Sequence, residues 1–258
     1  MRTVVLKPVL RRALCLLSAC LLLSACSWWP WGNGDETPPP PKTIGVISVL
    51  SDHVTVIDAT GQGWMRHRAS YPLGSWPIDA LATQTATAWL QKKDFDVRPV
   101  TVTASAFAAD ALGGPVARRG WLDRARPNLV DIIHHNVQPA DLPYYLLLVE
   151  ASGSDSIPDL HGIGFVHFSG KPQAFVLYHA FLIDGKSGET IDSFHADADN
   201  ESWGESSAIA GPNTDLPKAA WPKQVDAWTE EQQAAFRDAV ERELRTSLKS
   251  NLPRLDLP

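Results

Sequence analysis

The chain has 258 residues, of which 44% are hydrophobic and 20% are charged, a composition typical of a globular protein. Its formal net charge is −6, and an acidic protein is repelled by nucleic acid phosphates, so we expect no DNA- or RNA-binding role. All three cysteines, Cys15, Cys20 and Cys26, fall within the first 26 residues, which excludes an internal disulfide and a catalytic cysteine from the rest of the chain.

The first 25 residues are typical of an export signal. Four basic residues and no acidic residue lie within the first 12 positions, and an apolar run follows over 13–23. That run of about 11 residues is too short to cross a bilayer, for which a helix needs roughly 20. We therefore expect a signal peptide over 1–25, whose removal changes the net charge from −6 to −10.

Residues Leu23-Ser24-Ala25-Cys26 resemble the lipobox of bacterial lipoproteins, in which small residues precede a cysteine. The resemblance implies cleavage between Ala25 and Cys26, diacylglycerol on the Cys26 thiol and an acyl chain such as palmitate on the new amino terminus. A second match ends at Cys20, but the apolar run before it is too short, so we prefer Cys26. The alternative is an ordinary signal peptide in which the cysteine stands by chance. Ser27 follows the cysteine, which in this class implies sorting to the outer membrane.

Residues 26–42 are expected to form the lipidated cysteine and a tether rich in tryptophan and proline. Pro38 to Pro41 favour an extended polyproline helix, so the tether would hold the domain up to about 50 Å from the lipid. Trp28, Trp29 and Trp31 stand beside the anchor. They fit either a place at the lipid headgroups or an aromatic-rich spacer.

Residues 43–258 are expected to form a single globular periplasmic domain. Two β-branched runs, 44–50 and 54–59, predict an antiparallel hairpin. The first half of the domain further predicts a helix opening at Ser75-Trp76-Pro77, an edge or bulged strand over 96–103 because of Pro99, and short helices over 105–112 and 127–137.

The second half of the domain predicts strands and then a helix. The continuous apolar run 144–150 predicts a central strand buried on both faces. Further strands are expected over 162–168, and over 174–183 and 190–194, which pair around a glycine-containing turn, whereas 204–222 is expected to be a loop. Thr229 and Gln232 predict a capping box for an amphipathic C-terminal helix. The fold class is therefore α/β or mixed α+β, with a mixed sheet of about six or seven strands and helices packed on it.

The stretch AFLIDGKSGETIDSF resembles a strand, turn and strand segment of periplasmic lipoproteins through Phe181 to Asp184, Ser187-Gly188-Glu189 and Ile191. Those proteins are the activators of penicillin-binding proteins, the curli secretion lipoprotein and the N-terminal domain of the TolB translocation protein. YYLLLVE followed by HGIGFVHF also resembles uncharacterised proteobacterial lipoproteins. The resemblance brings no catalytic residue, and it implies a non-enzymatic envelope protein that binds a partner.

Several groups of residues are candidates for chemistry. His167, His179 and His195 lie near strands that we expect to be adjacent, so they are candidate metal ligands, against the alternative of structural histidines. Neither His-x-His nor HExxH accompanies them, and we expect no metal and no cofactor. The acidic stretch from Asp192 to Glu201 suits either a calcium site or a solvated loop, with the loop preferred. Ser154-Asp155-Ser156 lies in a loop after a strand, where a nucleophile would be accessible.

Trp203 and Trp221 lie in or beside the loop 204–222 and are candidate partner-binding aromatics, against the alternative of rings folded onto the domain surface. Our first hypothesis is a lipid-anchored scaffold or activator that binds another envelope protein. The second is a periplasmic hydrolase that uses a loop serine or a histidine-bound metal, and the third is a carrier of a small ligand or glycan.

Overall fold

The computed structural model describes residues 42–59, 67–74, 76–108, 111–112, 129–153, 160–168, 170–196, 209, 211–221 and 228–258. The predicted signal peptide, the lipidated cysteine and all but the last residue of the tether lie outside these ranges. The described residues from Lys42 to Pro258 cluster as one compact unit.

Ten of the described strands form two five-stranded sheets. The first has the order β11-β10-β7-β1-β4, made of Thr190–His195, Tyr178–Asp184, Tyr144–Glu150, Thr43–Val49 and Asp96–Arg98 respectively. The second has the order β12-β9-β8-β2-β3, made of Asn213–Asp215, Lys171–Val176, Ile163–Phe168, His53–Asp58 and His67–Pro72. A two-stranded sheet joins β5 (Thr101–Val102) to β6 (Val137–Gln138).

The predicted hairpin of 44–50 with 54–59 is wrong. β1 pairs in parallel with β4 and β7 in the first sheet, whereas β2 pairs with β3 and β8 in the second. Both strands hold runs of four buried residues, so each is covered on both faces, which an isolated hairpin does not supply. The three residues between them contain no glycine, and the chain runs forward from one sheet into the next.

The two sheets meet where three backbone segments bond to one another in a ring. The Ala151 N–H donates to the Leu177 carbonyl at 3.1 Å, the Leu177 N–H to the Gly162 carbonyl at 2.7 Å, and the Gly162 N–H to the Ala151 carbonyl at 3.0 Å. Ala151 follows β7, Gly162 precedes β8, and Leu177 separates β9 from β10. The predicted strand 174–183 is therefore two strands in different sheets, divided at Leu177.

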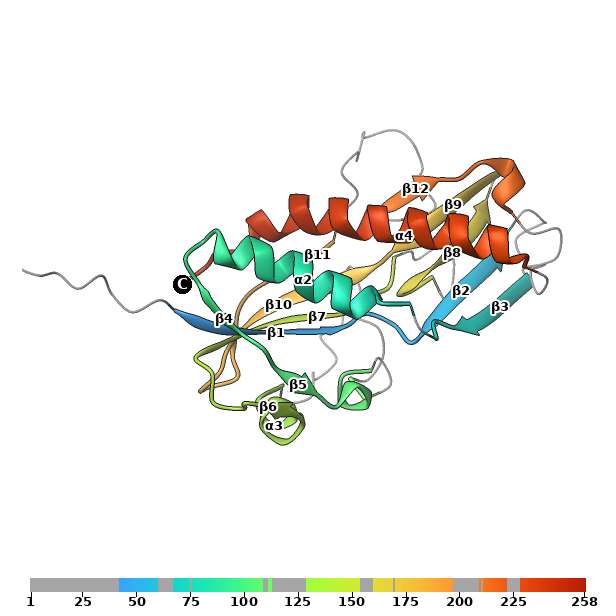
Figure 1. Cartoon of the computed structure of the whole chain (residues 1–258). Helices are drawn as coiled ribbons and strands as arrows, with labels where there is room; N and C mark the ends of the chain where they lie inside the picture. Colours follow the sequence, from blue (N-terminus) through green and yellow to red (C-terminus); the bar gives the residue numbers. More distant parts are fainter. Residues whose placement is uncertain are drawn as a thin grey trace, which may run out of the picture. The chain divides into compact units, whose positions relative to one another are not determined.

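Helices cover both faces of the first sheet (Figure 1). Helix α2 (Ile78–Gln91) and helix α4 (Glu230–Asn251) lie side by side on one face, over a core that includes Val46, Leu146 and Leu182. On the opposite face, α3 (Leu129–Asn136) and the β5–β6 pair enclose a second core around Ile47, Leu147 and Phe181. The alternation of side chains along each strand supplies both cores.

The C-terminal helix is held at its start and along one side. The predicted capping box is confirmed, since the Gln232 N–H donates to Thr229 Oγ1 and the Thr229 N–H donates to Gln232 Oε1. The predicted apolar stripe is buried, and its first residue, Phe236, stacks on Phe165 of β8 among the rings of Trp76 and Trp228. Aromatic packing of this kind adds to the area that the helix buries.

The mixed α+β class is confirmed, as are the central position of 144–150 and the edge position of the strand before Pro99. The described residues hold twelve strands in place of six or seven, because the predicted strands 96–103 and 174–183 are each divided in two and β3, β6 and β12 were not predicted. The predicted helix 105–112 is reduced in the described residues to a 3-10 turn, Ala104–Ala106, and the predicted loop 204–222 contains β12 and the 3-10 turn Lys218–Ala220. Among the described residues, no helix is long and apolar enough to cross a membrane.

The joint yields a stability prediction. Gly162 has φ +63°, and a Cβ added there would lie 2.8 Å from Glu150 Oε1, whereas Gly74 has a similar φ of +59° with open space around it. We expect Gly74→Ala to lower the free energy of unfolding by about 1 kcal/mol, the cost of the left-handed backbone. Gly162→Ala should cost more, because Glu150 must also leave its partner His161.

Urea unfolding of the purified variants measures both costs. The excess cost of Gly162→Ala over Gly74→Ala should disappear in a Glu150→Ala background, where the carboxylate is gone. An excess that persists there would show that the contact with Glu150 is not its cause.

Candidate functional site

The edge of the first sheet is only half covered. β4 pairs with the first half of β1, with Thr43 opposite Asp96, Ile44 opposite Val97 and Gly45 opposite Arg98. Beyond Arg98 the chain turns away at Pro99 toward β5 on the other face of the sheet (Figure 1). The second half of β1, from Val46 onward, therefore pairs with β7 on one side and with no described strand on the other.

Alternate residues of β1 direct their backbone groups to this edge. The Lys42 carbonyl accepts the Asp96 N–H at 3.0 Å, so the even-numbered residues of β1 face β4. The same alternation places the Val46 carbonyl and both backbone groups of Ser48 on the uncovered stretch. No strand that the structure describes pairs with β1 on this side beyond Gly45.

Asp79 closes the far end of the open edge. It stands in the first turn of α2, where the helix dipole favours an anion. Its Oδ1 accepts the Ser48 hydroxyl at 2.7 Å and the Leu50 N–H at 3.0 Å, and Leu50 is the next even-numbered residue. The carboxylate thus takes the place that a carbonyl of a neighbouring strand would occupy.

A groove of about 430 Å³ lies along this edge. The groove is lined by Val46 and Ser48 of β1, by Asp79, Ala80, Thr83 and Thr87 of α2, and by Val97 to Val100 and Val102. Its walls combine half-buried valines with hydroxyl groups. This mixture of apolar surface and a few polar groups is typical of ligand and peptide sites.

Of the two charged side chains that line the groove, Arg98 has an ion-pair partner, whereas Asp79 has hydrogen bonds alone. Arg98 is ion-paired with Asp96, with its Nη2 2.7 Å from Asp96 Oδ2. Burial raises the pKa of Asp79 above its ordinary value of 3.8, and the hydrogen bonds from Leu50 and Ser48 offset part of that shift. Both hydrogen bonds end on Oδ1, so Oδ2 remains an available acceptor in a partly desolvated place.

The three candidate histidines are not brought together. His179 of β10 lies directly opposite His195 of β11, with ring centroids 5.8 Å apart, in the first sheet. His167 lies in β8 of the second sheet, with its ring 4.9 Å from the ring of Trp221 and its Nδ1 3.8 Å from Asp58 Oδ1. Within the described ranges, no three His, Cys, Asp or Glu side chains are placed to hold a metal ion.

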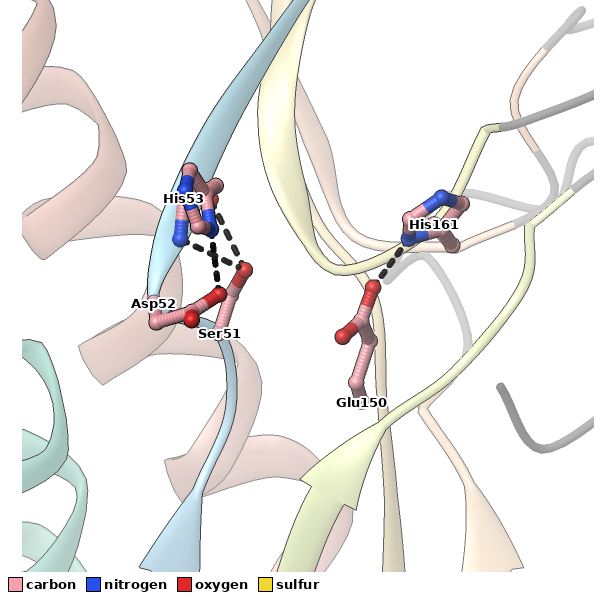
Figure 2. A network of polar contacts seen from close by, with 5 residues as sticks. All are labelled: Ser51, Asp52, His53, Glu150 and His161. Carbon is pink, nitrogen blue, oxygen red and sulfur yellow. Dashed lines mark hydrogen bonds and ion pairs between the residues drawn. The ribbon is translucent and has the colours of Figure 1, made fainter. Parts of the chain in front are cut away.

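Two polar pairs face each other near the joint of the sheets (Figure 2). His161 Nδ1 contacts Glu150 Oε1, and both side chains are largely buried, whereas His53 and Asp52 are exposed and lie 2.5 Å apart. Ser51 Oγ accepts the His53 backbone N–H and donates to the His53 carbonyl, not to the ring. Ser51, Asp52 and His53 therefore have the residue types and the aspartate–histidine contact of a hydrolase triad, but not its hydrogen bond between the serine hydroxyl and the histidine ring.

Trp221 packs against the domain. Its ring lies edge-on to Phe165 at 6.4 Å between centroids and close to His167, and it contacts the main core. Its predicted role as a partner-binding aromatic stays a prediction, because this packing leaves only part of the ring accessible. Trp203, the serines of 154–156 and the acids after Asp192 lie outside the described residues.

The turn that carries the resemblance to periplasmic lipoproteins is structural. Asp184 Oδ1 accepts the backbone N–H groups of Ser187 and Lys186 at 2.8 and 2.9 Å and the Ser187 hydroxyl at 3.1 Å. These bonds, led by the Ser187 N–H, lower the pKa of Asp184. Gly188 has φ +70° and packs on Val130 of α3, and Lys186 and Ser187 belong to the hairpin turn between β10 and β11.

No known protein-family model matches the sequence, and no curated protein matches it either. Among solved structures, protein XCC0632 from Xanthomonas campestris, of family DUF330, is 10% identical, with 83% of this chain and 85% of that chain covered and a TM-score of 0.38. Lipoprotein GNA1162 from Neisseria meningitidis is 12% identical, with 80% and 100% covered and a TM-score of 0.29. Similarity at this level identifies neither a family nor an activity for this chain.

The groove was not predicted from the sequence. Pro99 predicted that the strand 96–98 lies at an edge. It did not predict that this strand pairs with only half of β1, because the two strands lie 96 − 43 = 53 residues apart in the sequence. Asp79 follows a helix-opening Pro77, a common place for an acid at a helix start, and carries no signal of a contact with β1. Among the functional candidates, Ser48 and Asp79 are thus the ones that only the structure brings together.

The raised pKa of Asp79 predicts how stability depends on pH. A carboxyl group whose folded pKa lies above its unfolded value favours folding fully below about pH 3.8 and loses that contribution as the pH rises through the folded pKa. We expect Asp79→Asn to remove this component while Asn still accepts the two hydrogen bonds. The difference between the wild-type and Asp79→Asn unfolding free energies, measured by urea unfolding from pH 3 to 7, should therefore become less favourable to the wild type with rising pH. A flat difference would show that Asp79 titrates normally.

Proposed function

We propose that this chain is a lipoprotein of the bacterial envelope, held on a membrane by lipid on Cys26, whose folded domain binds another envelope protein. The observation that carries the anchor is the sequence Leu23-Ser24-Ala25-Cys26 after a basic segment and a short apolar run. Two or three acyl chains make release from a bilayer negligible, whereas one chain alone anchors only marginally. Ser27 supports the outer membrane as the destination.

The half-covered edge of β1 supports the binding role of the domain. An uncovered strand edge is a template for pairing with another chain, and proteins normally cover or charge such edges unless they use them. Here the edge lies in a groove whose walls are apolar and hydroxylated. The groove therefore supports partner binding better than catalysis, since its titratable groups, Asp79 and Arg98, are already engaged in structural contacts.

The anchor is tested by Cys26→Ser expressed in a bacterium with lipoprotein processing enzymes. We expect the wild type to enter the detergent phase on Triton X-114 separation and to fractionate with outer membranes, and Cys26→Ser to stay in the aqueous phase. Cys20→Ser is the matched control and should behave as wild type. If Cys26→Ser still enters the detergent phase, lipid on this thiol is not the anchor.

The partner-binding role is tested in cells with a photo-crosslinking amino acid placed at single positions of the full chain. Thr87 on the wall of the groove should give a discrete crosslinked product with another envelope protein. Lys249, exposed near the end of α4, is the control and should not give that product. The same product from both positions, or none from Thr87, Thr83 and Ala80, would count against a partner in the groove.

A further inference from the structure

We propose that the groove beside β1 binds an extended segment of a partner polypeptide, which adds to the open edge of β1 as a strand and carries a lysine or arginine. This inference rests on the proposed partner-binding function and names the chemistry of the segment bound. By the alternation of β1, the Val46 carbonyl, the Ser48 N–H and the Ser48 carbonyl lie on the side of the strand where the groove runs, at the spacing of a strand edge. Another extended backbone presents donors and acceptors at the matching spacing, as in other cases of strand addition.

The ends of the open stretch limit the segment to a few residues. At one end β4 occupies the edge as far as Gly45, opposite Arg98, and at the other the Asp79 carboxylate occupies the Leu50 N–H. The stretch from Val46 to Leu50 is about 13 Å long at ~3.3 Å per residue of strand. A bound strand therefore makes its backbone bonds over about four residues, with longer flanks running out of the groove.

The walls determine which side chains fit. Alternate side chains of an added strand point to opposite faces, so one set lies against Ala80, Thr83 and Thr87 of α2 and the other against Val100 and Val102. Small and β-branched side chains suit these walls, because Val100 and Val102 are half-buried and the helix side presents only a methyl group and two threonines.

Charge selects a cationic side chain. Arg98 is neutralised by Asp96 at 2.7 Å, so Asp79 is the groove carboxylate without an ion pair among the described residues that line the groove. The hydrogen bonds from Ser48 and Leu50 both end on Asp79 Oδ1, which leaves Oδ2 to accept a bond from the segment. A lysine or arginine of the segment would supply the opposite charge in a place where burial penalises the lone carboxylate, which is consistent with the direction of its pKa.

The test uses synthetic five-residue peptides and the isotopically labelled mature protein in detergent micelles. The parent peptide is acetyl-Val-Thr-Lys-Thr-Val-amide, and two further versions carry N-methyl groups on residues 1, 3 and 5 or on residues 2 and 4, so that each version lacks the N–H donors of one strand edge. We expect the parent to shift the Ser48 amide resonance and to slow its hydrogen exchange. One N-methylated version should lose this effect and the other should keep it, because an added strand bonds through one edge only.

A lysine-to-norleucine version tests the charge. It should bind about tenfold more weakly than the parent, the effect of losing one charge-assisted contact. The Asp79→Asn variant should bind the two peptides equally well. Glu241 of α4 lies on the other side of α2, away from the groove, so the Glu241→Gln variant should keep the preference for the lysine peptide. Both variants must show wild-type circular dichroism, and Asn retains the acceptor for Ser48 and Leu50.

Three outcomes overturn the inference: both N-methylated peptides bind like the parent, the peptides shift other surfaces while Ser48 stays unchanged, or norleucine and lysine bind alike to the wild type. Peptide-free protection of Ser48 that rises with protein concentration would assign the edge to a second copy of this chain and would also overturn it. A crosslinked partner at Thr87 together with any of these outcomes leaves the proposed function standing and removes only the strand-addition inference.

Discussion

The structure depends on the ring of three backbone hydrogen bonds that joins the two sheets. The Ala151 N–H donates to Leu177, the Leu177 N–H to Gly162 and the Gly162 N–H to Ala151, so strands that belong to different sheets are fixed to one another without a side chain taking part. An unpaired backbone group in this buried place would cost as much as a lost hydrogen bond, and the ring satisfies all three N–H groups. Gly162 takes part because its backbone has a positive φ, and its Cα faces the Glu150 side chain that contacts His161. The joint thus holds the end of β7, the start of β8 and the passage from β9 into β10 together.

Local patterns predicted the elements that a short stretch of sequence determines. The capping box of Thr229 and Gln232, the hairpin turn at Asp184 and the central strand 144–150 were all readable, since hydrophobic period and turn residues decide them. The pairing of strands was not readable. Nothing in 44–59 distinguishes a hairpin from two strands in consecutive sheets, because that choice is made by β7 and β8, about 100 residues further on. Leu177 divides one apolar run into two strands without a glycine or proline to mark the division.

The same reason explains the fate of the candidate sites. Histidines 179 and 195 were expected to lie near each other and do, since they stand on the two strands of a predicted hairpin, whereas His167 belongs to the other sheet and meets Trp221 instead. The groove beside β1 is assembled from β1, α2 and the segment after Pro99, three pieces of sequence that carry no shared motif. From the sequence, Asp79 is an ordinary acid in the first turn of a helix. In the fold, it takes the place of a neighbouring strand by accepting the Leu50 N–H.

The placement of β1 has a mechanical consequence. β1 is the first described strand, and it lies inside its sheet with a parallel neighbour on each side over its first half, β7 and β4. Tension applied through the preceding residues would pull β1 along its own axis, so the hydrogen bonds to β7 would be loaded together in shear and would not open one after another. A domain attached through this strand resists being peeled apart from its attachment point, and a polypeptide seated on the same strand would transmit its load directly into the best-supported part of the fold.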